Sequence, residues 1–214
     1  MTATLALVPL RSPGEGKTRL AGTLSRRERA GLATAMLADV LAALAHAPVD
    51  RVVVAASGPG GAELATALGA QVVTDPPGAD SLDAVIASAA QRLAPRGALL
   101  VVMADLPCLT GQDVGHLLAV QAAVGLAPTD DGGTGGLLRR PVSAMPTAFG
   151  PASAARHTDL AAAVGSPLQV VHRPGFARDL DTPEDLAALE RRSLGASTRS
   201  WLERHGAPPV TLHR

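Results

Sequence analysis

The stretch Ala98–Pro107 reads ALLVVMADLP, an apolar run that ends in an acidic residue and a proline. A short, fully apolar run of this kind is typical of a strand buried on both faces, as in a parallel sheet covered by helices. Because the proline stops the strand, Asp105 is expected at the carboxyl end of a central strand, where open α/β sheets bind ligands. The alternative for Asp105 is a helix-capping role in the turn.

Apolar strands and Ala/Leu-rich helices alternate on both sides of this stretch. The sequence predicts strands at 4–10, 51–55, 71–74 and 98–103, and helices at 26–46, 60–68, 81–93 and 110–123. Repeated strand–helix–strand units with apolar strands predict an α/β fold, in which a mostly parallel sheet carries helices on both faces.

The second half of the chain is less regular, because a polar, glycine-rich loop occupies 128–136. Strands are predicted at 137–142, near Thr147, at 168–172 and at 177–180, and helices at 152–164 and from 183 to about 205. Thr182 as N-cap and Pro183 at the first helical position mark the start of the last helix. With no internal repeat or low-complexity linker, the sequence predicts one domain over residues 1–214.

Composition excludes several classes of protein. The chain has 214 residues with 19 basic and 19 acidic side chains, and its aromatic residues are Phe149, Phe176 and Trp201. Without a basic surface or stacking platforms, nucleic acid is not an expected partner. No apolar run approaches the ~20 residues of a membrane span, and no signal segment is present, so a soluble, cytoplasmic protein with no membrane partner is expected. The lone Cys108 fits a reducing compartment.

The turn after the first strand is a candidate phosphate site. Residues 11–20 read RSPGEGKTRL, a glycine-containing turn with three cations. Backbone amides in such a turn can approach an anion without a Cβ in the way. Gly16, Lys17 and Thr18 also match the end of a P-loop, but the glycine that this motif needs five positions earlier is Arg11, so a P-loop kinase remains a minor alternative. A solvated surface turn is the other alternative.

Two acidic residues precede the last helix in an extended segment. Asp179 and Asp181 are two positions apart, so their carboxylates should point to one side and repel each other unless a cation lies between them. Hard oxygen ligands of this kind suit Mg²⁺, which binds one or two carboxylates together with substrate phosphates. The alternative is that Asp181 helps to cap the last helix, which leaves Asp179 unexplained.

A second glycine-rich loop, DDGGTGG at 130–136, and the segment FGPAS at 149–153 that opens a helix form a possible second anion pocket. Successive glycine amides, a hydroxyl and a helix N-terminus all favour an anion. The alternative is a flexible hairpin loop. A nucleoside triphosphate at the first loop, an acidic Mg²⁺ site and a phosphorylated acceptor at the second loop together indicate nucleotidyl transfer.

These motifs also carry a resemblance to a known family. The chain resembles MobA-like nucleotidyltransferases, and within them the 2-phospho-L-lactate or phosphoenolpyruvate guanylyltransferases of coenzyme F-420 biosynthesis. The resemblance spans nearly the whole chain and is carried by residues 8–11 with 17–20, 80–84, 105–107, 133–135, 149–157 and 179–186.

The resemblance implies a single α/β domain with a mixed, mostly parallel sheet of nucleotide-diphospho-sugar transferase type. Residues from 1 to about 125 would form the nucleotide-binding half, and residues from about 126 to 214 the acceptor-binding half with the C-terminal helix. Asp105, Asp179 and Asp181 would hold Mg²⁺, while Lys17, Arg11 and Asp105 would act in catalysis. The nucleotide would be bound by Leu10, Arg11, Lys17, Asp80, Leu82 and Asp83, and the acceptor by Thr134, Gly136, Gly150 and Ser153.

The implied reaction transfers GMP from GTP, the co-substrate, to phosphoenolpyruvate or 2-phospho-L-lactate, with a downstream transferase taking the unstable product. Three departures affect these expectations, because the family usually has asparagine where this chain has Asp83, a second threonine where it has Gly136, and arginine where it has Asp131. The alternatives are therefore a MobA-like enzyme with another acceptor, or a non-catalytic GTP-binding homologue. The last helix can pack on the sheet or support a homodimer, and the sequence leaves both open.

Overall fold

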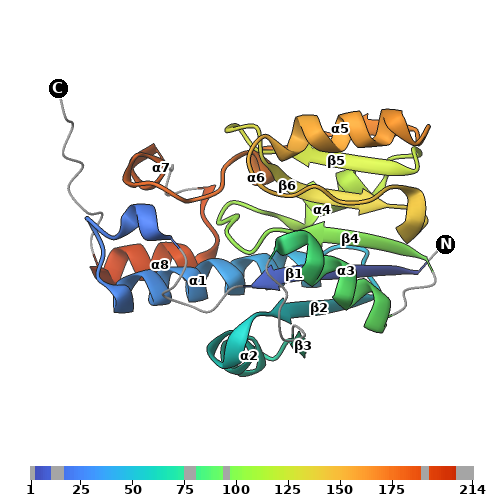
Figure 1. The fold of residues 1–214 in the computed structure, drawn as a ribbon. Coiled ribbons are helices and arrows are strands. Elements are labelled where there is room, and N and C mark those ends of the chain that lie inside the picture. The colour runs from blue at the N-terminus through green and yellow to red at the C-terminus, as the bar shows by residue number, and fades with distance from the viewer. Residues whose placement is uncertain (1–2, 11–16, 75–80, 94–96, 189–192, 206–214) are drawn as a thin grey trace.

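One β-sheet lies between two layers of helices in the computed structural model (Figure 1). The structure describes residues 3–10, 17–74, 81–93, 97–188 and 193–205. In this part of the chain the strands are β1 (Thr4–Leu10), β2 (Arg51–Ala56), β3 (Gln71–Thr74), β4 (Ala98–Val102), β5 (Val124–Pro128), β6 (Thr134–Arg139) and β7 (Leu168–Val170). The expected α/β fold is confirmed.

The strand order is β3-β2-β1-β4-β6-β5-β7. Strands β1 to β4 pair in parallel, and so do β5 and β7, whereas β6 runs antiparallel to both of its neighbours. The sheet is therefore mixed and mostly parallel, as expected. Because β1 and β4 pair in parallel, they end side by side at one carboxyl edge of the sheet.

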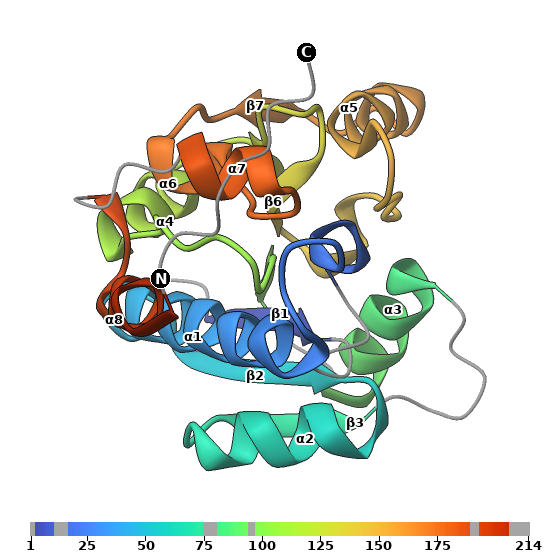
Figure 2. The same ribbon diagram turned by 90° about the vertical axis from the view of Figure 1, so that its left-hand side faces the viewer.

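The helices divide between the two faces of this sheet (Figure 2). Leucine, valine and alanine side chains from α1 and α4 pack on one face, and those from α3 and α5 on the other. The bounds are α1 (Arg26–Ala45), α2 (Gly58–Ala67), α3 (Leu82–Leu93), α4 (Gly111–Leu118), α5 (Ser153–Ala163), α6 (Pro174–Ala177), α7 (Pro183–Ala188) and α8 (Ala196–His205), with 3₁₀ helices η1 (Thr18–Leu20) and η2 (Val142–Ala144). Strands β1, β4 and β6 are buried along their whole length, which explains the continuous apolar sequence of β1 and β4.

A third group of buried apolar residues lies beyond the sheet and joins η1, α1, α8 and the segment before α7. We call it the third cluster; it consists of Leu20, Leu24, Leu32, Ala35, Met36, Leu180, Leu194, Trp201 and Leu202. Trp201 is 4% exposed and its ring stacks on His205, with centroids 4.4 Å apart. The third cluster therefore packs the last described helix, α8, against η1 and α1.

Asp39, which is buried on α1, holds the start of α8. Its two carboxylate oxygens accept hydrogen bonds from the backbone amides of Ser197 and Thr198, at 2.9 and 2.8 Å. The preceding Gly195 is required by this contact, because a Cβ there would lie 2.2 Å from the Asp39 carboxylate carbon. The carboxylate satisfies amide groups that a helix start otherwise leaves without partners.

We expect Asp39→Ala to lower the free energy of unfolding by about 3 kcal/mol, because two charge-assisted hydrogen bonds are lost and the α8 amides stay buried. Urea unfolding followed by circular dichroism measures this change. The matched control is Asp159→Ala, which removes an exposed carboxylate on α5 and should change stability by less than about 0.5 kcal/mol. Equal stability of the two variants would contradict the capping role of Asp39.

The structure differs from the sequence prediction at the end of α4 and at β5. The helix predicted at 110–123 ends at Leu118, where the Arg140 guanidinium donates hydrogen bonds to the carbonyls of Leu118 and Val120. These bonds satisfy carbonyls that a helix end leaves without partners. The strand β5 was not predicted, since its Gly125 and Pro128 are unusual in strands. Gly125 is needed because a Cβ would lie 2.9 Å from Val120 Cγ2.

Four further predictions differ from the structure. Strand β6 begins at Thr134 instead of residue 137, and residues 146–149 form no strand. The strand predicted at 177–180 is wrong, because α6 occupies residues up to Ala177 and the chain then continues without regular structure. The last predicted helix is two helices, α7 and α8, and the second begins where Asp39 caps it. None of the described helices is both long and apolar enough to cross a membrane.

Candidate active site at the carboxyl edge of the sheet

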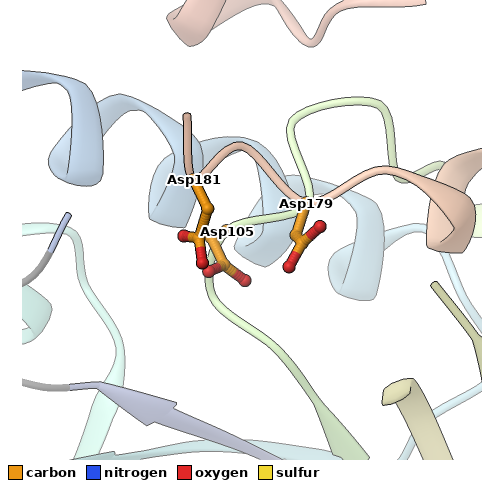
Figure 3. Close-up of side chains that lie close together, drawn as sticks. All are labelled: Asp105, Asp179 and Asp181. Carbon is orange, nitrogen blue, oxygen red and sulfur yellow. The ribbon is translucent and has the colours of Figure 1, made fainter. Parts of the chain in front are cut away.

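Three carboxylates from two distant parts of the sequence meet at the carboxyl edge of the sheet (Figure 3). Asp105 follows β4, and Asp179 and Asp181 lie between α6 and α7. The Leu180 amide donates a hydrogen bond to the carbonyl of Asp105, with a length of 3.2 Å. This backbone contact places Asp179 and Asp181 beside Asp105. The sequence alone had suggested, but not shown, that the three lie together.

Leu180 also determines which way its neighbours point. Its side chain is completely buried in the third cluster, so the side chains on either side of it, Asp179 and Asp181, point away from that cluster. The start of the segment is fixed by α6, where the Arg173 guanidinium pairs with the buried Asp113 at 2.9 Å. Asp130 donates its amide to the carbonyl of Ala177 at 2.7 Å. The carboxylates are therefore held by a packed and hydrogen-bonded segment.

One oxygen from each of Asp105, Asp179 and Asp181 lies within 4.8 Å of the other two. Burial raises the pKa of Asp179 to about 7, and the negative charges of Asp105, Asp131 and Asp181 add to this effect. Burial and the neighbouring carboxylates therefore both disfavour the ionised form of Asp179.

Lys17 is the cation nearest to this cluster among the described residues. Its Nζ lies 2.7 Å from Asp105 Oδ2 and 2.5 Å from Asp181 Oδ1, and its side chain is 10% exposed. Burial alone would lower the pKa of the Lys17 ammonium, but the two carboxylates outweigh burial and raise it. The backbone of Lys17 has φ 56°, a left-handed conformation that is strained for a residue with a Cβ.

The donor set fits a hard divalent cation. All three groups supply carboxylate oxygens, which Mg²⁺, Ca²⁺ and Mn²⁺ prefer over nitrogen or sulfur ligands. One ammonium bonds two of the carboxylates, while burial and the neighbouring carboxylates disfavour ionisation of the third, Asp179. A divalent ion would supply the missing positive charge. The cluster thus matches the expected ligand set Asp105, Asp179 and Asp181 in composition and proximity.

Buried polar side chains form a second group on the α5 side of the sheet. The hydroxyl oxygen of Thr134 lies 3.0 Å from Ser153 Oγ and 3.0 Å from His157 Nδ1. All three residues are buried, and Ser153 stands at the start of α5. Burial with little water access lowers the pKa of His157 to about 4, so its ring is neutral at pH 7.

A β-bulge explains why Thr134 faces α5. Ala127 pairs with Gly136, but the next residue of β5, Pro128, pairs with Thr134, so β6 has one extra residue, Gly135. Residues two apart on a regular strand share a face, and an inserted residue changes the face of those that follow. Gly136 faces the opposite side, where a Cβ would lie 2.7 Å from Phe176 Cε1, so only its backbone is available to a ligand.

The segment that precedes α5 is tied to helix α3. Asp83, in the first turn of α3, accepts a hydrogen bond from the Phe149 amide at 3.0 Å. The Phe149 carbonyl accepts one from Arg156, and Gly150 has φ +117°, which only glycine adopts readily. The structure therefore places Asp83 between the nucleotide and acceptor halves expected from the sequence.

The remaining expected residues fall into two groups. Leu10 is the buried last residue of β1, and Leu82 begins α3. Arg11 and Asp80 lie outside the described residues. Sequence reasoning did not single out His157, although it stands in the quoted 149–157 string and is a buried histidine in a polar helix. The hydrogen bonds of His157 to Thr134 and Ala148 mark it as part of the site, and these contacts cannot be read from the sequence.

Fold and site together define a class of protein, the nucleotidyltransferases. A solved structure provisionally named a nucleotide-diphospho-sugar transferase, from Desulfovibrio desulfuricans G20, superposes with a TM-score of 0.76 at 17% identity, covering 95% of each chain. At this identity the likeness shows the fold alone. A family model described as "Guanylyl transferase CofC like" matches residues 4–208. The chain therefore belongs to the CofC-like guanylyl transferase family and is an enzyme.

Two relatives illustrate the range of this family. A phosphoenolpyruvate guanylyltransferase of Roseiflexus castenholzii is 36% identical over 206 residues, which cover 94% of this chain and 97% of that protein. A 2-phospho-L-lactate guanylyltransferase of Methanothermobacter thermautotrophicus is 35% identical over 204 residues, which cover 94% of this chain and 90% of that protein. The resemblance stated from the motifs is confirmed.

Proposed function

We propose that this enzyme transfers GMP from GTP to a small phospho-acid, phosphoenolpyruvate or 2-phospho-L-lactate, and releases pyrophosphate. The observation that carries the proposal is the group of three carboxylates with Lys17 at the carboxyl edge of a guanylyl transferase fold. Relatives that span the full length of the chain bear the names of both activities, which supports this pair of acceptors.

In this reaction a phosphate oxygen of the acceptor attacks the α-phosphorus of GTP, and the bond from that phosphorus to the bridging oxygen of the β-phosphate breaks. The bonding electrons leave with pyrophosphate. The attacking oxygen is already anionic, so the protein needs no general base. Its contribution is to position the two phosphates in line and to compensate their charge.

We assign Asp105, Asp179 and Asp181 to holding Mg²⁺. When bound, the ion supplies positive charge to the triphosphate oxygens. Lys17 leaves one or both carboxylates and contacts the triphosphate, together with Arg11. On the nucleotide side, Leu10, Leu82 and Asp80 would line the site. Asp83 offers its second oxygen to the guanine or ribose, since the first already accepts the Phe149 amide.

On the acceptor side, we assign the hydroxyls of Thr134 and Ser153 and the backbone around Gly150 and Gly136. The α5 N-terminus and its buried hydroxyls favour an anion. An exposed glycine turn with φ +117° at Gly150 lets the backbone approach a phosphate or carboxylate closely.

Pyrophosphate release tests the proposal. The enzyme with Mg²⁺ is given GTP or ATP, and phosphoenolpyruvate, 2-phospho-L-lactate or 3-phosphoglycerate as acceptor, with mass spectrometry to detect the product. Turnover with GTP and one of the first two acceptors is expected. Turnover with another acceptor alone would replace the proposed substrate, and GTP binding without turnover on any acceptor would indicate a non-catalytic nucleotide-binding homologue.

The product would contain a reactive phosphoanhydride. We propose that a downstream transferase accepts it as part of coenzyme F-420 biosynthesis and that both enzymes work in the cytoplasm, where GTP is available. The support is chemical, since an activated intermediate of this kind is useful only when a second enzyme consumes it before water does.

The raised pKa of Asp179 makes Mg²⁺ binding depend on pH. Because its pKa is about 7 in the folded protein, the carboxyl group is mostly protonated at pH 6 and ionised at pH 8. Binding of the cation requires the ionised form, so we expect affinity for Mg²⁺ about tenfold weaker at pH 6 than at pH 8. Calorimetric titration at the two pH values measures this difference.

The same group affects stability with the opposite sign. A carboxyl whose pKa is raised on folding stabilises the protein below its unfolded pKa, and this contribution is lost as pH rises toward 7. In the presence of a chelator, stability should therefore decline between about pH 4 and pH 7 more steeply for the wild type than for Asp179→Asn. An equal decline of stability with pH in the wild type and Asp179→Asn, together with a pH-independent affinity for Mg²⁺, would contradict the assignment of Asp179 as a metal ligand.

A further inference from the structure

His157 connects three groups of the acceptor side and has no role in the function proposed so far. Its ring is completely buried, and its edge faces the ring of Phe149 at a centroid distance of 4.9 Å. The Ala148 amide lies 2.9 Å from Nε2, and Thr134 Oγ1 lies 3.0 Å from Nδ1. Both ring nitrogens are thus engaged, one by a backbone group and one by a hydroxyl.

The backbone contact determines the tautomer. An amide N–H can only donate, so Nε2 must accept and carries no proton. A neutral imidazole has one N–H, which must then be on Nδ1 and must donate to Thr134 Oγ1. The low pKa of His157, caused mainly by burial, agrees with a neutral ring. The nearby charges are Asp83, which opposes this shift, and Arg139 and Arg156, which add to it.

The hydroxyl pair Thr134 and Ser153 has one proton that is not used in a hydrogen bond within the pair. Thr134 Oγ1 receives the imidazole proton, and the 3.0 Å contact with Ser153 Oγ uses one of the two hydroxyl protons. Among the residues that the structure describes, the pair has no other hydrogen-bond partner, so the second hydroxyl proton lacks an acceptor. A buried donor without an acceptor costs free energy, and an anionic oxygen is the strongest partner for it.

We propose that His157 is a positioning residue for the acceptor, and that its Nδ1–H orients the Thr134–Ser153 hydroxyl pair so that the remaining proton is donated to the bound phospho-acid. The inference rests on the proposed function and deepens it. If Nδ1 accepted a hydrogen bond from Thr134 instead, the threonine proton would be donated to the imidazole and would not be available to the acceptor. The tautomer imposed by Ala148 therefore keeps the pair a donor, which an anion requires.

Two substitutions separate this role from a merely structural one. The amide of asparagine reaches the place of Nδ1, so His157→Asn can keep the donor to Thr134 while losing the acceptor for Ala148. The longer side chain of glutamine reaches the place of Nε2, so His157→Gln can keep the acceptor while losing the donor. The two variants remove opposite halves of the imidazole's hydrogen bonding.

We expect His157→Gln to raise the KM for the acceptor at least about tenfold, as for a lost hydrogen bond to a charged group, with the KM for GTP unchanged. His157→Asn should stay within about threefold of the wild type. Equal losses in the two variants, or a larger loss in His157→Asn, would overturn the proposal, because the ring would then matter only for holding Ala148.

A measurement on the unchanged protein keeps the inference testable if a variant does not fold. Nitrogen-15 spectra of the histidine rings should show His157 neutral at pH 7, with its proton on Nδ1; a proton on Nε2 would overturn the proposal. If the wild type releases no pyrophosphate with any acceptor, the proposed function fails. The inference is then decided by a calorimetric measurement of phosphoenolpyruvate binding. The proposal predicts weaker binding to His157→Gln than to the wild type. If the wild type does not bind phosphoenolpyruvate, the proposal is overturned.

Discussion

Asp105→Asn should lower the turnover number by a factor on the order of 10³, with GTP and acceptor saturating. The substitution keeps the size of the side chain but removes one of the three charges proposed to hold the cation. Mg²⁺ would then be bound by two carboxylates, and the positive charge that compensates the triphosphate would be misplaced or absent during bond formation. The backbone carbonyl of residue 105 still accepts from Leu180, so the segment should stay docked.

Pyrophosphate release over a range of Mg²⁺ concentrations measures this effect. The control is Asp159→Asn, which changes an exposed carboxylate on α5 and should leave turnover unchanged. Circular dichroism and urea unfolding of Asp105→Asn should resemble those of the wild type. Near-normal turnover of Asp105→Asn at saturating Mg²⁺ would exclude the proposed metal role.

Lys17→Met should have two effects of opposite sign. Turnover should fall about a hundredfold, because the triphosphate loses a buried cation. Affinity of the nucleotide-free protein for a divalent cation should rise about tenfold, because the ammonium that now bonds Asp105 and Asp181 no longer competes. A lysine with only a structural role would lower stability and would not strengthen metal binding.

Calorimetric titration with Mn²⁺ or Mg²⁺ in the absence of nucleotide measures the second effect. Arg26→Met is a suitable control, since Arg26 is an exposed cation at the start of α1 and should affect neither quantity. Unchanged or weaker metal binding in Lys17→Met would show that the Lys17 ammonium does not compete with the metal ion for the carboxylates.

The sequence predicted the first half of the fold well, because each strand there is a short apolar run between amphipathic helices. Asp105 was singled out because it follows an apolar strand, and Asp179 and Asp181 because two carboxylates two residues apart in an extended segment repel each other. Their mutual distance depended on the Leu180 amide and on its buried side chain, and a contact across so many residues has no local signature.

The elements that were missed depend on partners distant in sequence. The break before α8 follows from the Asp39 carboxylate on α1, and the end of α4 follows from Arg140 on the far side of a hairpin. The face of Thr134 depends on the bulge at Gly135, which the run of glycines did not reveal. His157 was missed for the same reason, since a lone buried histidine resembles any other core residue until its partners are known.

Trp201 gives the molecule a single optical reporter. It is the one tryptophan of a chain without tyrosine, so near-ultraviolet emission comes from the third cluster alone. The same cluster encloses Leu180, between two of the three carboxylates, and the ring stacks on His205. Trp201 fluorescence during a cation titration would therefore report changes in the packing of the segment that carries Asp179 and Asp181 against the third cluster. No label near the reacting phosphates is needed.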